Sequence, residues 1–212
     1  MTTLAIMKAR IADELARDDL TSQIAYAITD AITAYQDERF FFSESRALTF
    51  NTVASQEFYT SADASWIPTI TKIDYIFVYE GNTPQQLMPM RPADMESAVT
   101  NATSLGVPSW YCYYNKTLRF YSIPDDVYVI RVGAATTVDA PASDAETDNA
   151  WMTSAERLIR SRAKLELALH VLKDPELAQT MSEAVTEALE QIRERTTNIT
   201  QVGDGLVRSM PF

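Results

Sequence analysis

The sequence contains few of the residues that most often build metal, disulfide and nucleotide sites. Its 212 residues include one cysteine, Cys112, one histidine, His170, and five glycines. A single cysteine cannot form a disulfide within the chain, and with a single histidine it cannot complete a Cys/His zinc cluster. The glycines match neither the dinucleotide-binding fingerprint nor the P-loop. We therefore expect no cofactor and no bound metal.

Long apolar runs and an excess of basic residues are also missing. No stretch reaches the roughly 18 apolar residues of a membrane-spanning helix, and the first residues lack the pattern of a signal peptide. We expect a soluble protein with no membrane segment. The 18 basic and 29 acidic residues give a net charge of -11. This balance argues against a nucleic-acid-binding protein, whose footprint is basic, but it allows DNA to pass nearby without adhering.

Both ends of the chain carry apolar residues at helical spacing. Two stripes of period 3.6 occupy residues 151–172 and 177–192, on either side of Asp174-Pro175. We interpret this break as a joint at which Asp174 caps the second helix. Shorter stripes occupy residues 4–15 and 24–35. Because neither pair can bury its apolar faces alone, we predict a four-helix bundle formed by the N- and C-terminal segments.

Helix caps are also visible near the N-terminus. Thr3 precedes the first stripe, and Asp18-Asp19-Leu20-Thr21 precedes the second and offers caps for it. These residue types accept hydrogen bonds from the free amides of a helix start, so we predict both positions as caps.

The middle of the chain has a different period. From Ala47 to Thr137, β-branched and aromatic residues alternate with polar ones, with a helix starting at Pro92 and a hairpin at Asn115-Lys116. We predict an inserted, mostly antiparallel β domain, either a small sandwich or an open barrel. The fold class is therefore α+β. The predicted domains are the N-terminal half of the bundle (1–46), the inserted β domain (47–137), an acidic linker (138–150), the C-terminal half of the bundle (151–197) and an extended C-terminal tail (198–212).

Candidate catalytic residues are few. His170 lies among apolar residues in a predicted helix without a second histidine, which favours a packed or half-exposed helical residue. Cys112 lies between two tyrosines in a predicted strand, which favours a small core residue over a nucleophile. An encounter of Cys112 with His170 in space stays open.

Carboxylate pairs are plentiful in this acidic chain. Glycoside hydrolysis needs two carboxylates at a defined separation across a cleft, and that separation is not visible in a sequence. We interpret most pairs as solvated faces or turn residues. The pairs considered are Asp18/Asp19, Glu38/Glu44 and Asp125/Asp126.

Two clusters are candidates for protein contacts. Phe40-Phe41-Phe42 cannot all face one side of a regular element, so they form either a corner between domains or, together with Trp66, a subunit interface. The helical spacing of Arg157, Arg160 and Lys164 places them on one face, which is either solvated or a basic patch that faces an acidic partner.

The order of these signals resembles a known family. It is the tailed-phage head-to-tail adaptor family, the group that contains the tail tubular protein A of short-tailed phages. One departure is Phe41, since a tryptophan often follows the first phenylalanine in such proteins. The segments that carry the resemblance are Tyr35-Gln36-Asp37-Glu38-Arg39-Phe40, Phe42-Ser43-Glu44, Gly106-Val107-Pro108, Leu118-Arg119-Phe120-Tyr121-Ser122-Ile123-Pro124-Asp125, Trp151-Met152 and Ala155-Glu156-Arg157-Leu158-Ile159.

The resemblance implies a non-enzymatic structural protein of the virion, at the head–tail junction and assembled in the host cytoplasm. It would form a homo-oligomeric ring of twelve copies between the portal protein and a downstream tail or nozzle protein. DNA would pass through its channel without specific binding. The tail that would reach the portal contains Val202, Leu206, Val207, Met210 and Phe212.

Two other functions stay open at this point. One is a tail-associated cell-wall glycan hydrolase that uses a carboxylate pair. The other is a soluble, non-catalytic binding module.

Overall fold

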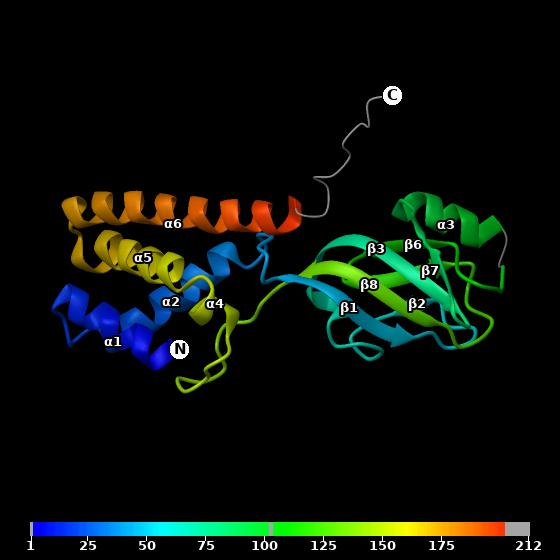
Figure 1. The fold of residues 1–212 in the computed structure, drawn as a ribbon, viewed down its shortest axis with the longest axis horizontal. Coiled ribbons are helices and arrows are strands. Elements are labelled where there is room, and N and C mark those ends of the chain that lie inside the picture. Colours follow the sequence, from blue (N-terminus) through cyan, green and yellow to red (C-terminus); the bar gives the residue numbers. More distant parts are fainter. Residues whose placement is uncertain (1, 102–103, 202–212) are drawn as a thin grey trace, which may run out of the picture. The chain divides into compact units, whose positions relative to one another are not determined.

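The computed structural model describes residues 2–101 and 104–201, and the chain divides into two compact units (Figure 1). One unit combines the residues before Ser43 with those after Thr137, and the other is formed by residues 43–137. Helices dominate the first unit and strands the second, which confirms the predicted α+β class.

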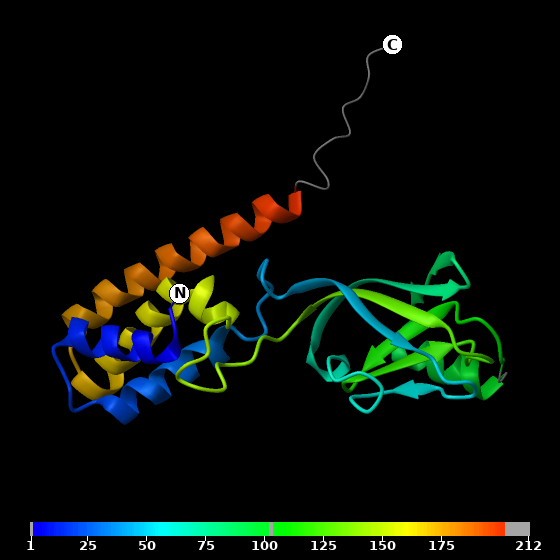
Figure 2. The same cartoon turned by 60° about the horizontal axis from the view of Figure 1, so that its bottom comes forward.

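The helical unit is organised around one central helix. Both α2 and α6 pack on α5, while α1 contacts α2 and α5 (Figures 1 and 2). Because α6 packs mainly on α5, the four-helix bundle predicted from the stripes is not confirmed. The helices are α1 (Leu4–Leu15), α2 (Thr21–Tyr35), α4 (Ala150–Thr153), α5 (Glu156–Leu167), a π-helical turn (Ala168–Leu172) and α6 (Pro175–Gln201).

The N- and C-terminal segments share one apolar core. It includes Met7 and Ile11 from α1, Ile28 from α2 and Leu158 from α5, all at most 1% exposed. Trp151 is also buried there, and its indole N–H donates to the carbonyl of Val138 at 2.9 Å. Its one polar atom is thus satisfied, as burial requires.

The first two helix starts differ in how they are capped. The Thr3 hydroxyl accepts a hydrogen bond from the N–H of Ile6 at 3.3 Å, which confirms the predicted cap. The segment from Asp18 to Thr21 does contain the N-cap position of α2, Leu20, but the predicted side-chain cap is wrong, because no side chain accepts a capping hydrogen bond there. Instead, the carboxylate of Asp19 accepts two hydrogen bonds from the guanidinium of Arg17. This charge-assisted pair holds the carboxylate away from the helix amides.

The joint between the last two helices is confirmed. The π-helical turn is followed by its C-cap residue, Lys173, which has a left-handed backbone with φ of 55°. The Asp174 carboxylate then accepts from the N–H groups of Glu176 and Leu177 at 3.1 and 3.0 Å. The helix that starts here runs to Gln201, further than the loss of apolar periodicity predicts. Within this extension the Thr197 hydroxyl donates to the carbonyl of Arg193.

In residues 43–101 and 104–137, the described part of the β unit, the strands form two four-stranded sheets (Figure 2). The first sheet has the order β1-β8-β3-β4 and is antiparallel; the second has the order β2-β7-β6-β5, in which only the β5–β6 pair is parallel. The strands are β1 (Glu44–Asn51), β2 (Phe58–Tyr59), β3 (Ile70–Glu80), β4 (Thr83–Gln86), β5 (Met88–Pro89), β6 (Trp110–Tyr114), β7 (Thr117–Tyr121) and β8 (Val129–Thr136). A 3₁₀ turn (Ile67–Thr69) and helix α3 (Pro92–Asn101) complete the unit.

One core is shared by the two sheets. Ile76 and Val132 of the first sheet and Leu118 and Phe120 of the second belong to the same buried cluster. The predicted hairpin joins β6 to β7, and both Asn115 and Lys116 have positive φ, at 49° and 58°. Two left-handed residues in succession are the signature of a type I′ turn, whose twist matches that of the strands.

Candidate functional site

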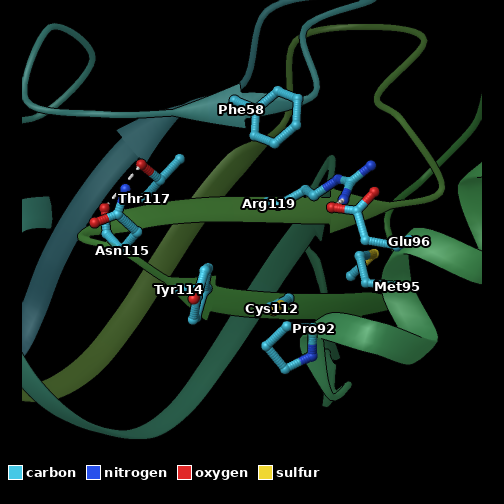
Figure 3. A pocket seen from close by; sticks show the side chains of 9 residues that line it. All are labelled: Phe58, Pro92, Met95, Glu96, Cys112, Tyr114, Asn115, Thr117 and Arg119. Carbon is cyan, nitrogen blue, oxygen red and sulfur yellow. Dashed lines mark hydrogen bonds and ion pairs between the residues drawn. The ribbon is translucent and has the colours of Figure 1, made fainter.

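A pocket of about 200 Å³ opens on the outer side of the second sheet (Figure 3). It lies where α3 packs on β6, with β7 and β2 beside it. The residues that line it are Phe58, Pro92, Met95, Glu96, Cys112, Tyr114, Asn115, Thr117 and Arg119. Small-molecule sites usually measure about 300–1,000 Å³, so this pocket is better matched to one amino-acid side chain.

Arg119 is the charged centre of this pocket. Although it is only 8% exposed, its guanidinium forms ion pairs with Glu57 and with Glu96, the latter at 2.6 Å. Its charged carbon also lies 4.8 Å from the centre of the Phe58 ring, at cation–π distance. Two carboxylates thus oppose one cation, and the side chain of Glu96 is 70% exposed. The pocket therefore presents a surplus negative charge to its surroundings.

The chemistry available in the pocket favours binding over catalysis. Arginine stays protonated in proteins and cannot act as a general base. The Cys112 thiol is buried, and this burial raises its pKa, while the charge of Arg119 acts in the opposite direction. A buried thiol with a raised pKa is a poor nucleophile. Cys112 is buried beneath the pocket on the outer side of the sheet, outside the core cluster between the two sheets. His170 belongs to the other unit, where it is exposed and lies 3.3 Å from Glu166.

Several of the carboxylates considered in the sequence are paired with other side chains. The guanidinium of Arg17 lowers the pKa of Asp19 to about 2. The carboxylate of Asp125 accepts a hydrogen bond from the Tyr128 hydroxyl at 2.6 Å, which raises the pKa of Tyr128 to about 12. Glu38 pairs with Arg193 at 2.6 Å. These contacts agree with turn and surface roles.

The aromatic corner packs inside its own unit. Phe40 is completely buried, and the Phe42 ring lies 5.2 Å from that of Trp151 in an edge-to-face arrangement. Phe41 is half-buried, with the guanidinium carbon of Arg195 4.3 Å above its ring. Such packing agrees with a structural corner. Their predicted role in a subunit interface stays a prediction, and in this conformation only Phe41 and Phe42 retain surface for it.

Trp66 has a similar position in the β unit. It is half-buried against the core between the sheets, with its ring 5.9 Å from that of Phe50. Its predicted interface role also stays a prediction.

Neighbouring carboxylates neutralise the positive charge of the predicted basic patch. Glu14 of α1 accepts from Arg160 at 2.9 Å and from Lys164 at 2.6 Å. Arg157 instead pairs with Glu187 of α6 at 2.8 Å. The three cations therefore tie α5 to two different helices. A contact with an acidic partner stays a prediction, and it would have to compete with these ion pairs.

Other predicted features can be placed only in part. The tail residues Val202, Leu206, Val207, Met210 and Phe212 lie outside the described residues. Among the side chains of residues 2–100 and 104–199, none of the clusters of His, Cys, Asp and Glu is arranged to hold a metal ion. In the same part of the chain, each helix is too short or too polar to cross a bilayer.

The model of the family described as SU10 adaptor protein matches residues 2–206. The chain belongs to this family. No curated protein matches the chain.

Membership in this adaptor family agrees with the resemblance inferred from the sequence, at the level of a phage head-to-tail adaptor. It implies a structural virion protein and a non-enzymatic role. A specific likeness to tail tubular protein A is not shown by the match.

Two features of this adaptor were missed in the sequence. The Arg119 cluster joins residues 62 and 23 positions away, and no local spacing connects such distant residues. The second is the row of Tyr75, Phe77 and Tyr79 on the outer side of the first sheet. Its signal was present, because the alternation of these aromatics with buried Ile76 and Val78 makes both faces of β3 apolar.

Proposed function

We propose that the protein forms a homo-oligomeric ring of twelve copies at the head–tail junction of a tailed phage. The ring joins the portal protein to a downstream tail or nozzle protein, and it is assembled in the host cytoplasm. The observation that carries this proposal is the adaptor-family match, which extends over residues 2–206 and so includes both units.

Charge supports a channel that DNA passes without specific binding. The net charge is -11, and basic side chains of α5 form ion pairs with carboxylates of α1 and α6. The exposed side of α6 adds Glu183, Glu190 and Glu194. Because affinity for DNA depends on cations that replace its counterions, such a protein holds phosphates weakly.

The contact with the portal is assigned to the C-terminal tail. Leu206, Val207, Met210 and Phe212 give this short segment an apolar character. Residues of this kind gain free energy by burial against another protein. We propose that these residues, together with Val202, bind the portal.

The decisive experiment mixes the purified protein with the portal protein of the same phage and images the product by electron microscopy. We expect a ring of the protein on each portal. A protein that remains monomeric and does not attach to the portal would overturn the proposal. A chain that ends at Val202 should keep its circular dichroism spectrum but lose attachment, because it lacks the apolar tail. Attachment by this shortened chain would refute the role of the tail.

The same preparation separates the adaptor from a glycan hydrolase. An adaptor leaves the turbidity of a peptidoglycan suspension unchanged. Clearing that is abolished by a single Glu→Gln change would instead establish an enzyme.

A further inference from the structure

The outer side of the first sheet is apolar where a solvated antiparallel sheet is usually polar. Tyr75, Phe77 and Tyr79 of β3 alternate with Ile76 and Val78, which belong to the core. The three rings are half-buried and form no part of that core.

Strand register extends this aromatic row into a face. Phe77 lies opposite Arg131 of β8, and Tyr79 lies opposite Val129, which is 45% exposed. On the other side, Pro84 and Gln86 of β4 are paired with the same two aromatics. Arg131 is the one side chain of this set with a full charge at neutral pH. We call these outward residues of β3, β4 and β8 the aromatic face.

The opposite side of the β unit also exposes large apolar side chains. Phe58, Trp110 and Tyr114 are 49%, 38% and 69% exposed, and Met88 of β5 is 53% exposed. Phe58 and Tyr114 line the pocket that contains Arg119 and Glu96 (Figure 3). We call this set, together with the pocket, the pocket face.

The two faces differ in shape and in charge. The aromatic face carries Arg131, whose Nε donates to the carbonyl of Arg46 and which has no carboxylate at ion-pair distance among the described residues. The pocket face carries a surplus negative charge, most exposed at Glu96. An apolar surface with one unpaired cation thus complements an apolar surface with one excess anion.

Surfaces that lie on opposite sides of one unit and complement each other make a head-to-tail contact between copies. Such a contact is heterologous, and it generates a closed ring when the rotation between copies closes. We infer that the aromatic face of one copy packs on the pocket face of the next. This inference rests on the proposed ring, and it names the surfaces that hold the ring together.

The pocket determines what kind of side chain anchors this contact. Its volume of about 200 Å³ is lined by Met95, Pro92 and the rings of Phe58 and Tyr114. Anchors of protein interfaces are most often aromatic side chains seated in such pockets and surrounded by a rim that excludes water. In the inferred contact, Phe77 at the centre of the aromatic face is the apolar anchor that enters the pocket of the next copy. Arg131, its register partner, forms an ion pair with Glu96 of that next copy.

Site-directed crosslinking tests the contact. In a Cys112→Ser background, Val129→Cys marks the aromatic face and Tyr114→Cys marks the pocket face; both native side chains are substantially exposed. The two variants carry tags of different size, are mixed and are treated with a bis-maleimide reagent. We expect crosslinked dimers that contain one copy of each variant, and little dimer from either variant alone. A chain with both cysteines should give a ladder of oligomers.

Ala62→Cys provides the matched control, because Ala62 is exposed in the same unit but belongs to neither face. It should crosslink poorly to Tyr114→Cys. Dimers formed by Val129→Cys alone or by Tyr114→Cys alone would show a symmetric contact and overturn the inference. Rings that form on the portal without the mixed crosslink would also overturn it, while leaving the proposed adaptor function intact. Mixed crosslinks without portal attachment would support the contact between copies and overturn the proposed adaptor function.

A charge reversal tests the same contact without cysteines. Arg131→Glu places a carboxylate near Glu96 of the next copy and should weaken self-association about tenfold or more, since like charges brought together at an interface repel each other. The double variant Arg131→Glu/Glu96→Gln removes this repulsion and leaves Arg119 paired with Glu57, so it should recover part of the loss in analytical ultracentrifugation. Lys173→Glu, an exposed reversal in the helical unit, should have little effect. Failure of the double variant to recover, with a native circular dichroism spectrum, would contradict the contact.

Discussion

The ring of Tyr75 lies against Gly133, its register partner on the neighbouring strand β8. A β-carbon built on Gly133 would be 2.3 Å from Cζ of that ring, far inside van der Waals contact. The backbone of Gly133 has no positive φ, so the requirement for glycine is steric. One missing side chain therefore allows an aromatic ring to lie over a strand at the end of the aromatic face.

Gly133→Ala should therefore destabilise the protein and move Tyr75. The added methyl group forces the ring outward or the strands apart, and overpacking of this kind costs about 1–3 kcal/mol. Urea unfolding, followed by circular dichroism, measures the change. Because the ring is close to the surface and can swing away, we expect a value near the lower end.

The matched control removes the ring. In a Tyr75→Ala background, the methyl group of Gly133→Ala no longer collides with a ring. Gly133→Ala should therefore lower the free energy of unfolding much less in this background than in the native protein. An equal cost in both backgrounds would show that strand conformation, and not Tyr75, disfavours alanine at this position.

Local patterns explain why much of the fold could be predicted. The joint at Asp174-Pro175 and the hairpin at Asn115-Lys116 depend on residues within a few positions of each other. The pairing of β1 with β8 joins Phe50 to Ile130, and nothing local specifies that choice. The failure of Asp19 to cap α2 has a different and local cause, because Arg17, two positions away, binds its carboxylate.

The site was harder to predict than the fold. Arg119 and Glu57 come together only once β2 and β7 are paired. The aromatic face was readable in principle, because alternating apolar and aromatic residues on β3 leave neither side polar. What a sequence cannot supply is which of the two sides faces the core.

Asp174→Ala tests the joint between α5 and α6. The carboxylate caps two amides at the start of α6, and the loss of such a cap costs about 1 kcal/mol. Asp174→Asn should retain most of the stability, because the amide oxygen can accept the same bonds. Thermal unfolding compares the two variants with Asp30→Ala, an exposed change in the interior of α2. Equal losses for alanine and asparagine would indicate that charge, rather than capping, is responsible.

Phe40 and Phe41 should separate stability from assembly. Phe40→Ala empties a completely buried position beside Trp151 and should cost about 3–5 kcal/mol. Phe41→Ala removes a half-exposed ring and should cost clearly less. If Phe41 contacts another subunit as predicted, its variant should fold normally and still lose self-association in analytical ultracentrifugation. Unchanged association would remove Phe41 from the subunit interface.

The reactivity of Cys112 should report whether α3 is docked on the second sheet. The thiol is 5% exposed, and its raised pKa leaves little thiolate near neutral pH, so the native protein should react slowly with a disulfide reagent. The rate should rise with pH as the thiolate forms. Met95 is completely buried and lines the same pocket, so Met95→Ala opens access and should accelerate labelling about tenfold or more.

The exposed Met88 supplies the control for this experiment. Met88→Ala removes the same side chain from a strand beside β6 without uncovering the pocket, and the labelling rate should stay near that of the native protein. If both variants accelerate equally, the thiol is reached through general opening of the β unit. If only Met95→Ala does, helix α3 is the cover, and binding of a neighbouring copy at the pocket face should then slow labelling in the native protein.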